Sequence, residues 1–245
     1  MLKSVLITGA SGGIGQALCQ TFKEDDYFVI ATDRIDGTCE CDAFIRADIG
    51  LLCTDSNSQK QFFAEVRSYL HDQSLFALIN NAAVQILGKT ENIQISDWQQ
   101  TLSVNLLAPF TLIQELLPEL QNGKGSVVNI SSIHATNTKP NFVCYATSKT
   151  ALIGLTQSMA VDLGSKIRIN AICPAATATP MLMAGFEEKE EEFERLSDMH
   201  PLGRIAQSKE IAEAALFLTS PHASFITGTF LNVDGGIGVR LHDPD

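Results

Sequence analysis

The sequence predicts a three-layer α/β protein in which a doubly wound, seven-stranded parallel sheet is covered by helices on both faces. Short, nearly continuous apolar runs alternate with longer segments of helical periodicity, as in parallel sheets that are buried on both faces. A glycine-rich turn directly follows the first apolar run. The 245 residues are 45% apolar, which suffices for one large core. Because no linker or repeat divides the chain, we expect a single domain over residues 1–245.

The strands are predicted from apolar runs that are bounded by turn residues. In chain order these runs are 5–8 (VLIT), 27–33 (YFVIATD), 43–49 (AFIRADI), 75–80 (LFALIN), 126–131 (SVVNIS), 167–173 (IRINAIC) and 229–234 (TFLNVD).

The helices between them are predicted from periodicity and from their start and stop signals. Residues 59–70 place Phe62, Phe63, Val66 and Leu70 on one face. Ser96 is a candidate N-cap, Pro118 and Gly164 follow predicted helix ends, and Ser208 is a second candidate cap. The predicted helices are 16–23, 59–70, 96–117, 146–163, 187–195 and 208–218. The polar stretch 176–205 interrupts the rhythm, and we expect residues 180–205 to form a lid over the substrate.

The charge and cysteine content exclude several classes of function. The formal net charge of −11 argues against nucleic-acid and anionic-membrane partners. No apolar run is long enough for a signal peptide or a membrane span. The six cysteines and five histidines lack metal-ligand spacing, so we expect free thiols, no metal site and a cytoplasmic location.

The turn TGASGGIG at residues 8–15 is a candidate phosphate-binding loop. Gly9, Gly13 and Gly15 would let backbone amides approach a pyrophosphate at the N-terminus of the following helix. The spacing is not G-x-G-x-x-G, so a tight turn that needs glycine only for its geometry is the alternative.

Asp33 ends the second predicted strand, where an acid would reach ribose hydroxyls and repel a 2′-phosphate. Arg34 follows and could instead bind that phosphate. We therefore expect NAD, with NADP as the less favoured cofactor.

Tyr145 and Lys149 stand four residues apart in the predicted helix, on one face. An ammonium beside a phenol favours the phenolate, so we expect the pKa of Tyr145 to fall below its usual value of about 10. Such a tyrosine would serve as a general acid or base.

Together these segments resemble the short-chain dehydrogenase/reductase family, from Val5 to Gly236. TGASGGIG is similar to the family's TGxxxGxG, NNAA (80–83) to NNAG, and YATSK (145–149) to YxxxK. Asn105, Ser132, CPAATATPM (173–181) and NVDGG (232–236) also stand where family motifs occur. The resemblance implies a Rossmann fold and an oxidoreductase that binds a nicotinamide cofactor.

The resemblance also implies roles for individual residues. Tyr145 would exchange the proton, Ser132 would hold the substrate oxygen, Lys149 would lower the pKa of Tyr145 and contact the nicotinamide ribose, and Asn105 would hold a water. The implied cofactor-binding residues are Gly9, Ser11, Gly13, Ile14, Gly15, Asp33, Arg34, Asp48, Ile49, Asn80, Asn81, Ala82, Tyr145, Lys149, Pro174, Thr177 and Thr179. Ala83 and Ala175 replace family glycines, which puts nicotinamide placement in question if either position needs a positive φ.

Substrate selectivity is expected from residues around these motifs that the family does not fix, namely Gln85, His134, Phe142 and Met181. Met181 could equally be a core residue, and His134 an ordinary histidine at a pocket edge.

The expected activity is NAD(H)-dependent interconversion of a secondary alcohol and a ketone. The alternatives are NADPH-dependent reduction of carbonyls or 3-oxoacyl thioesters and, from another class, a nucleotide sensor without turnover. The expected partner is a small alcohol or carbonyl compound. Apolar residues on several faces of 96–117 and 146–163 suggest a homo-oligomer, either a tetramer or a dimer.

Overall fold

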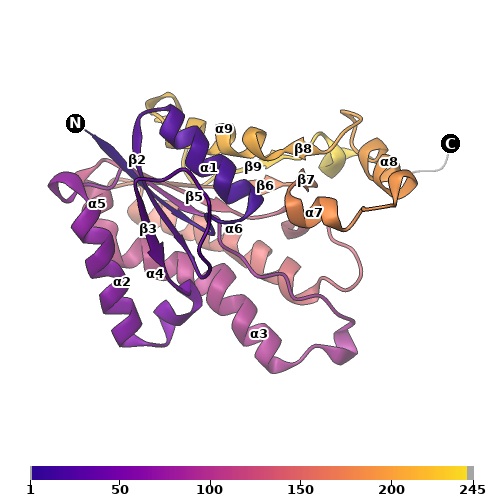
Figure 1. Ribbon diagram of the computed structural model, residues 1–245, viewed down its shortest axis with the longest axis horizontal. Helices are drawn as coiled ribbons and strands as arrows, with labels where there is room; N and C mark the ends of the chain where they lie inside the picture. Colours follow the sequence, from indigo (N-terminus) through magenta and orange to yellow (C-terminus); the bar gives the residue numbers. More distant parts are fainter. Residues whose placement is uncertain (1, 242–245) are drawn as a thin grey trace.

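The computed structural model describes residues 2–241 and confirms the predicted fold class (Figure 1). Seven strands form one fully parallel sheet in the order β3-β2-β1-β4-β5-β6-β9. The strands are β1 (Lys3–Thr8), β2 (Tyr27–Asp33), β3 (Ala43–Arg46), β4 (Ala77–Asn80), β5 (Ser126–Ile130), β6 (Arg168–Pro174) and β9 (Phe230–Val233).

Helices cover both faces of this sheet. Helices α1 (Gly13–Glu24) and α9 (Ser208–Thr219) lie together on one face, above the sheet in Figure 1. Helices α2 (Ser56–Tyr69), α4 (Ala108–Glu115) and α6 (Val143–Leu163) lie on the other face. Each face has its own buried apolar cluster, because strand side chains alternate between the two sides.

The remaining elements are short. They are α3 (Ile95–Leu102), α5 (Leu117–Asn122), α7 (Pro180–Ala184), α8 (Glu190–Asp198), a two-stranded sheet of β7 (Thr177–Ala178) and β8 (Ala206–Gln207), and the single turns η1 (Ile49–Cys53), η2 (His71–Gln73), η3 (Thr90–Asn92), η5 (Ile133–Ala135), η6 (Pro221–Ala223) and η7 (Ile237–Val239).

The strand order reverses at β1, which pairs with β2 on one side and with β4 on the other. The connections that leave β1 and β4 therefore cover opposite faces of the sheet, and a crevice opens at their carboxyl ends. The predicted phosphate turn and Asn81 follow strands that end at this edge, and Asp33 is the last residue of another such strand. The topology thus brings residues from distant parts of the sequence to one place.

The prediction of one continuous helix over residues 96–117 is wrong. The chain forms α3, one π-helical turn η4 (Ser103–Leu107), then α4, and a break at Leu116 precedes α5. A π-turn inserts an extra residue into the helical ladder and is often found at functional sites. The inserted turn contains the buried Asn105.

Several predicted boundaries also differ. Gln94 and Gln207, rather than Ser96 and Ser208, precede α3 and α9, and each forms a capping box with an acid three residues on. The third strand ends at Arg46 because Asp48 then caps the turn η1. Helix α6 begins three residues before Ala146. The predicted helix 187–195 is α8, which begins at Glu190.

The predicted lid segment contains α7 and α8, to the right of the sheet in Figure 1. The strands β7 and β8 pair through Thr177 with Ala206 and Ala178 with Gln207. This small sheet joins the two ends of the segment, so α7 and α8 belong to one insertion whose two ends are held together by strand pairing.

Two glycines of the turn 8–15 are required by their surroundings. Gly9 has a φ of +65°, which disfavours any other residue. Gly15 lies so close to the preceding turn that a Cβ would come 2.1 Å from the carbonyl oxygen of Gly9 and 2.7 Å from Cα of Ala10. Both neighbours are backbone atoms and cannot move aside cheaply.

We predict that Gly15→Ala destabilises the protein by about 2–4 kcal/mol, because the methyl group collides with the turn itself. The matched control is Gly12→Ala, whose Cβ would have its nearest contact at 3.5 Å. Urea unfolding measures both. Equal stability of the two variants would contradict the close packing of this turn.

Candidate functional site

The phosphate turn is tied to the loop that follows β4. The Thr8 hydroxyl accepts hydrogen bonds from the amides of Asn81 and Ala82, both at 3.0 Å. The Asn81 side-chain amide donates to the carbonyls of Thr8 and Gly9, also at 3.0 Å. Asn81 therefore holds the end of β1 in the shape that the turn requires.

Asn80 lies differently from its neighbour. It is buried, and its amide donates at 2.7 Å to Asn129, whose own amide donates to Thr156. This chain links β4, β5 and α6 inside the protein. Asn80 thus acts as an interior hydrogen-bonding residue in the structure, whereas Asn81 and Ala82 lie at the crevice.

Asp33 stands at the end of β2 beside the phosphate turn. One carboxylate oxygen accepts the Ser11 amide at 3.0 Å, and the other accepts the Arg34 amide at 2.7 Å. A carboxylate has about four acceptor sites, so capacity remains for hydroxyl donors. The Arg34 side chain is exposed and forms no ion pair among the described residues.

Asp48 and Ile49 follow β3 on the same edge. The Asp48 carboxylate accepts the Gly50 amide at 2.9 Å and so caps η1, while Ile49 is buried against the core. Asp48 itself is exposed, with one of its oxygens used by the cap.

Ser132 and Tyr145 meet although they are thirteen positions apart in the sequence. Ser132 follows β5, and Tyr145 lies in the first turn of α6. The Ser132 hydroxyl is close enough to the Tyr145 phenol to lower its pKa, and the amide of His134 donates to the Ser132 oxygen at 3.1 Å. A carbonyl oxygen that approaches this pair would meet two hydroxyl donors.

The predicted direction of the Tyr145 pKa is wrong. Burial raises the pKa above the usual value for tyrosine, and the hydrogen bond with Ser132 lowers it by less. Spacing in a helix reveals the neighbouring lysine but not the loss of water around the phenol. Tyr145 therefore holds its proton at neutral pH, which is the form that a general acid needs.

Lys149 carries an ammonium group into the interior. The residue is 2% exposed, and its ammonium nitrogen donates to the Ile130 carbonyl at 2.7 Å. The same nitrogen lies 5.7 Å from the centre of the Tyr145 ring. Burial lowers the pKa of Lys149 from 10.5 to about 8. An ammonium has three donors, so this group can still donate to a ligand.

Asn105 projects from the π-turn and joins three parts of the chain. It accepts the Val84 amide at 2.8 Å and donates to the Val84 carbonyl at 2.9 Å and to the Ser148 hydroxyl at 3.0 Å. The Ser148 hydroxyl donates in turn to the Tyr145 carbonyl at 2.7 Å. Asn105 therefore braces the helix of Tyr145 and Lys149. Val84 and Ser148 were not singled out from the sequence, because ordinary residues at these positions leave no pattern.

The segment after β6 faces the phosphate turn. Pro174 ends β6 in a buried position, and Thr177 donates to the Ala175 carbonyl at 3.0 Å. Thr179 caps α7 by accepting the Leu182 amide. A Cβ on Gly13 would come 2.9 Å from Cβ of Thr179 and 2.8 Å from Cδ of Pro180. Residues predicted for the pyrophosphate and for the nicotinamide end of the cofactor are therefore neighbours.

The two alanines that replace family glycines cause no backbone strain. Neither Ala83 nor Ala175 is among the described residues with a positive φ. The question that they raised about nicotinamide placement is thus resolved for backbone geometry.

These observations fit a dinucleotide cofactor. Gly13 and Gly15 leave no room for side chains in the turn, Asp33 has spare acceptor capacity beside it, and the buried Lys149 ammonium has spare donors. The charge or hydrogen-bonding character of each group suits one part of a dinucleotide. Amides at the start of α1 suit phosphates, a carboxylate suits ribose hydroxyls, and an ammonium suits the second ribose.

The four predicted substrate residues divide into two groups. His134 and Phe142 are half-buried and stacked, with ring centres 4.2 Å apart, and both rings lie edge-on to Tyr145. Gln85 is exposed in the loop after β4, and Met181 on α7 is 84% exposed, so Met181 is not a core residue. The structure brings only His134 and Phe142 against Tyr145.

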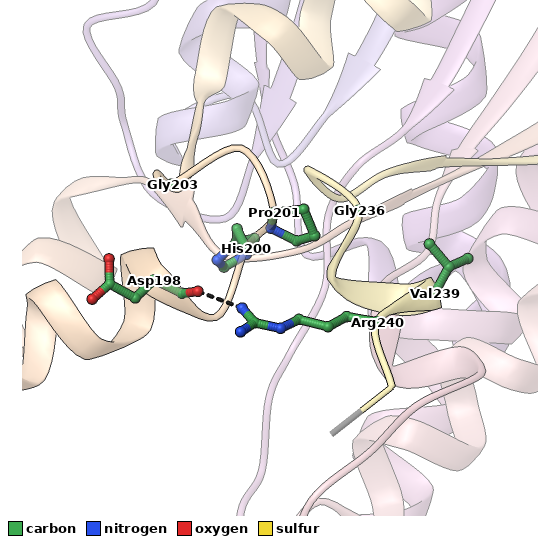
Figure 2. Close-up of a pocket in the computed structure, with 7 residues that line it drawn as sticks. All are labelled: Asp198, His200, Pro201, Gly203, Gly236, Val239 and Arg240. Atoms are coloured by element: carbon green, nitrogen blue, oxygen red, sulfur yellow. Dashed lines mark hydrogen bonds between the residues drawn. The ribbon is translucent and has the colours of Figure 1, made fainter. Parts of the chain in front are cut away.

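A separate hollow of about 550 Å³ lies between the end of α8 and η7 (Figure 2). Arg240 crosses it and donates to the Met199 carbonyl at 3.1 Å and to that of Asp198. None of the predicted site residues lines this hollow. It is therefore distinct from the crevice at the end of the sheet.

The sulfur atoms and acids form no metal centre within residues 2–241. All six cysteines are free thiols, as expected, and Cys39 and Cys41 bring their sulfurs to 3.8 Å. Among the described residues, every helix is too short or too polar to span a membrane.

A family model described as enoyl-(acyl carrier protein) reductase matches residues 9–238. The chain belongs to the short-chain dehydrogenase/reductase family. It is 30% identical over 244 residues to an acetoacetyl-CoA reductase from Acinetobacter sp. (strain RA3849), with 96% of this chain and 97% of the relative covered. This short-chain dehydrogenase/reductase is accordingly an oxidoreductase of a family that binds nicotinamide cofactors.

Solved structures of the same family superpose over nearly the whole chain. The aldohexose dehydrogenase of Thermoplasma acidophilum has a TM-score of 0.91 and 33% identity, with 100% of this chain and 97% of that chain covered. ElxO with NADP bound has a TM-score of 0.87, and 4-hydroxyisoleucine dehydrogenase with NADH has 0.86. Each is 27% identical and covers 98% of this chain and 100% of its own. Both forms of the cofactor thus occur among its structural neighbours.

We predict a pH dependence of stability that isolates the buried Lys149 ammonium. Its pKa is about 8 in the folded protein and 10.5 in the unfolded chain, so the unfolded chain binds more protons between these values. The free energy of unfolding of the wild type should therefore rise relative to Lys149→Met by about 3 kcal/mol between pH 7 and pH 10.5. Urea unfolding at several pH values measures the difference. Parallel curves for the two proteins would mean that the ammonium is not desolvated.

Proposed function

We propose that the protein is an NAD(H)-dependent oxidoreductase that interconverts a secondary alcohol and a ketone or other carbonyl. The observation that carries this proposal is that Ser132 and Tyr145 come together next to the buried Lys149 ammonium. Two hydroxyl groups and one desolvated cation at the crevice of a dinucleotide fold are the groups that a carbonyl reduction needs.

In the reductive direction, Tyr145 gives its proton to the substrate oxygen, and Ser132 donates a hydrogen bond to that oxygen. A nicotinamide cofactor, when bound, supplies the hydride. The developing negative charge on Tyr145 is favoured by Lys149, which lies one helical turn away and keeps its charge below pH 8. In the oxidative direction the same tyrosine removes the hydroxyl proton.

Asn105 has a positioning role in this proposal. Its three hydrogen bonds to Val84 and Ser148 hold the start of α6, from which Tyr145 and Lys149 project. The water that the family resemblance implies for Asn105 would lie on the Lys149 side of this residue and connect the ammonium with solvent.

The preference for NAD rests on Asp33. Its carboxylate is fixed by the Ser11 and Arg34 amides, while the Arg34 side chain is exposed. A fixed anion at this place accepts ribose hydroxyls and repels a 2′-phosphate. Gly9, Gly13, Ile14 and Gly15 would hold the pyrophosphate, Asp48 and Ile49 the adenine, Asn81 and Ala82 the adenosine ribose, and Pro174, Thr177 and Thr179 the nicotinamide end.

A second candidate function is NADPH-dependent reduction of a 3-oxoacyl thioester. Its support is the resemblance to an acetoacetyl-CoA reductase and the NADP complex of a structural neighbour. The exposed Arg34 would then turn toward the 2′-phosphate. A nucleotide sensor without turnover is disfavoured because Ser132, Tyr145 and Lys149 are all assembled.

The proposal includes the architecture around the centre. The chain forms one catalytic domain, residues 180–205 close over the substrate, and the enzyme works in the cytoplasm as a homo-oligomer. Leu107 on η4, Phe110 on α4 and Val161 on α6 are 44%, 37% and 88% exposed, on helical segments whose other faces are buried. A second copy of the chain would cover these apolar residues.

We predict that Tyr145→Phe lowers kcat by about 10²–10⁴-fold while NADH binding is retained, because only the transferred proton is lost. Stopped-flow reduction and nicotinamide fluorescence measure the two properties. The variant Ser132→Ala should shift the rise of the alcohol-oxidation rate with pH to higher pH, because Ser132 lowers the pKa of Tyr145, which must be deprotonated to act as the base. Full activity of the phenylalanine variant would exclude Tyr145 as the acid.

We predict that the wild type binds NADH more tightly than NADPH and that Asp33→Ala reduces this preference by about ten- to a hundredfold, the value of a charge-assisted hydrogen bond. Arg34→Ala is the matched control and should leave the preference intact. Fluorescence titration with both cofactors measures it. Tighter NADPH binding by the wild type, abolished in Arg34→Ala, would support the second candidate function.

We predict that light scattering at micromolar concentration gives a dimer or tetramer mass and that Val161→Glu lowers the mass. A charge placed on a buried interface cannot be desolvated without a partner. A monomer mass for the wild type would remove the oligomer from the proposal.

A further inference from the structure

An aromatic wall stands beside the hydroxyl pair of Ser132 and Tyr145. The His134 and Phe142 rings are stacked at 4.2 Å with an interplanar angle of 15°, and their centres lie 6.0 Å and 6.2 Å from that of Tyr145. All three rings are half-buried. A compound whose carbonyl reaches Tyr145 would therefore lie close to the His134 and Phe142 rings.

Lys139 brings a positive charge to the wall. Its ammonium nitrogen lies 4.9 Å from the centre of the Phe142 ring, within the range of a cation–π contact. The Phe142 ring centre in turn lies 6.2 Å from that of Tyr145. The distance from the Lys139 ammonium to the Tyr145 ring centre therefore cannot exceed the sum of these two distances. Lys139 is exposed, so its ammonium is accessible from solvent.

The loop that carries Lys139 is tied down on both sides. Two residues before it, the Asn137 amide donates to the Gly238 carbonyl at 3.1 Å. Two residues after it, the Asn141 carbonyl accepts the Gly88 amide at 3.0 Å. The backbone at Lys139 is therefore positioned by two separate parts of the chain, and Pro140 restricts it further.

No carboxylate within residues 2–241 forms an ion pair with Lys139. Asp234, whose neighbour Gly238 lies against Ile133, is already engaged by the amides of Gly236 and Gly238. The imidazole of the wall does not compete as a cation, because burial and the charge of Lys139 lower the pKa of His134. In a protein of net charge −11, the wall thus carries a cation that no carboxylate of the described residues pairs with.

We propose that Lys139 binds an anionic group of the substrate while the carbonyl or alcohol of the same molecule meets Ser132 and Tyr145. The substrates are then oxo and hydroxy compounds that carry a carboxylate or a phosphate on the far side of the Phe142 ring. This inference rests on the proposed function, which it deepens by naming a substrate class and a residue that selects it. Lys139 contributes to binding and is not part of the proton transfer.

The test compares anionic compounds with neutral ones of the same skeleton. Reduction is measured with the wild type, Lys139→Gln, Lys139→Arg and Lys60→Gln. One set of substrates is a series of methyl-ketone carboxylates of increasing chain length, each compared with its methyl ester. The other set compares dihydroxyacetone phosphate with dihydroxyacetone. Lys60 is exposed on α2, so its variant controls for net charge alone. The two types of acid distinguish a carboxylate from a phosphate.

The wild type should have a higher kcat/KM for the acids than for the esters. Lys139→Gln should reduce this acid-to-ester ratio of kcat/KM about three- to tenfold, mainly by raising KM for the acids, as expected for a partly exposed charge pair. Lys139→Arg should keep the ratio, Lys60→Gln should not change it, and added salt should weaken it. An unchanged ratio in Lys139→Gln, with esters and acids both reduced, would overturn the role of Lys139 and leave the proposed function standing.

Calorimetric binding of the same carboxylates in the presence of NADH provides a readout that does not need turnover. Weaker binding to Lys139→Gln than to Lys60→Gln supports the proposal even if no compound is reduced, in which case the proposed function fails separately. Absence of binding to the wild type at every chain length, for carboxylates and phosphate alike, overturns it.

Discussion

Among residues 2–241, the Lys149 ammonium has one hydrogen-bond acceptor in the interior, the carbonyl of Ile130, and the surrounding structure is arranged around this constraint. Desolvating a cation is costly, and burial accordingly lowers the pKa of Lys149 to about 8. The carbonyl is available because β5 ends at Ile130, where its ladder with β6 also ends. A parallel sheet whose strands end at one edge provides such an acceptor next to the crevice that binds ligands.

The same helix then fixes the other groups of the centre. Tyr145 lies one turn before Lys149 on α6, and Ser132 reaches it from the loop after β5. The π-turn at Asn105 secures this arrangement from the opposite side through Ser148 and Val84. Burial raises the pKa of Tyr145 and lowers the pKa of Lys149. At neutral pH Tyr145 is therefore a protonated donor, and Lys149 is a cation that loses its proton more readily than an ordinary lysine. This pair of opposite shifts suits a reversible proton transfer.

Much of this arrangement could be predicted from the sequence. Seven apolar runs gave the strands, and the motif residues fell at the ends of those strands because a parallel sheet collects its carboxyl ends at one edge. The break of the helix at Asn105 could not be predicted, since the contacts that Asn105 makes there are hydrogen bonds to residues 21 and 43 positions away. The direction of the Tyr145 pKa was wrong for the same reason, because burial is a property of the folded chain. Lys139 had no motif at all and emerged only from its contact with Phe142.

The central claim is that hydride passes between a nicotinamide and a substrate carbon held at Tyr145. It is tested most directly by isotope transfer. The enzyme is incubated with NADH that carries deuterium at C4, in each of its two stereochemical forms, and with a panel of ketones, and the alcohols are analysed by mass spectrometry. The account predicts that deuterium from one form alone appears on the carbinol carbon. If NADH binds tightly and no ketone acquires deuterium from either form, the protein holds the cofactor without transferring hydride, and the account is wrong.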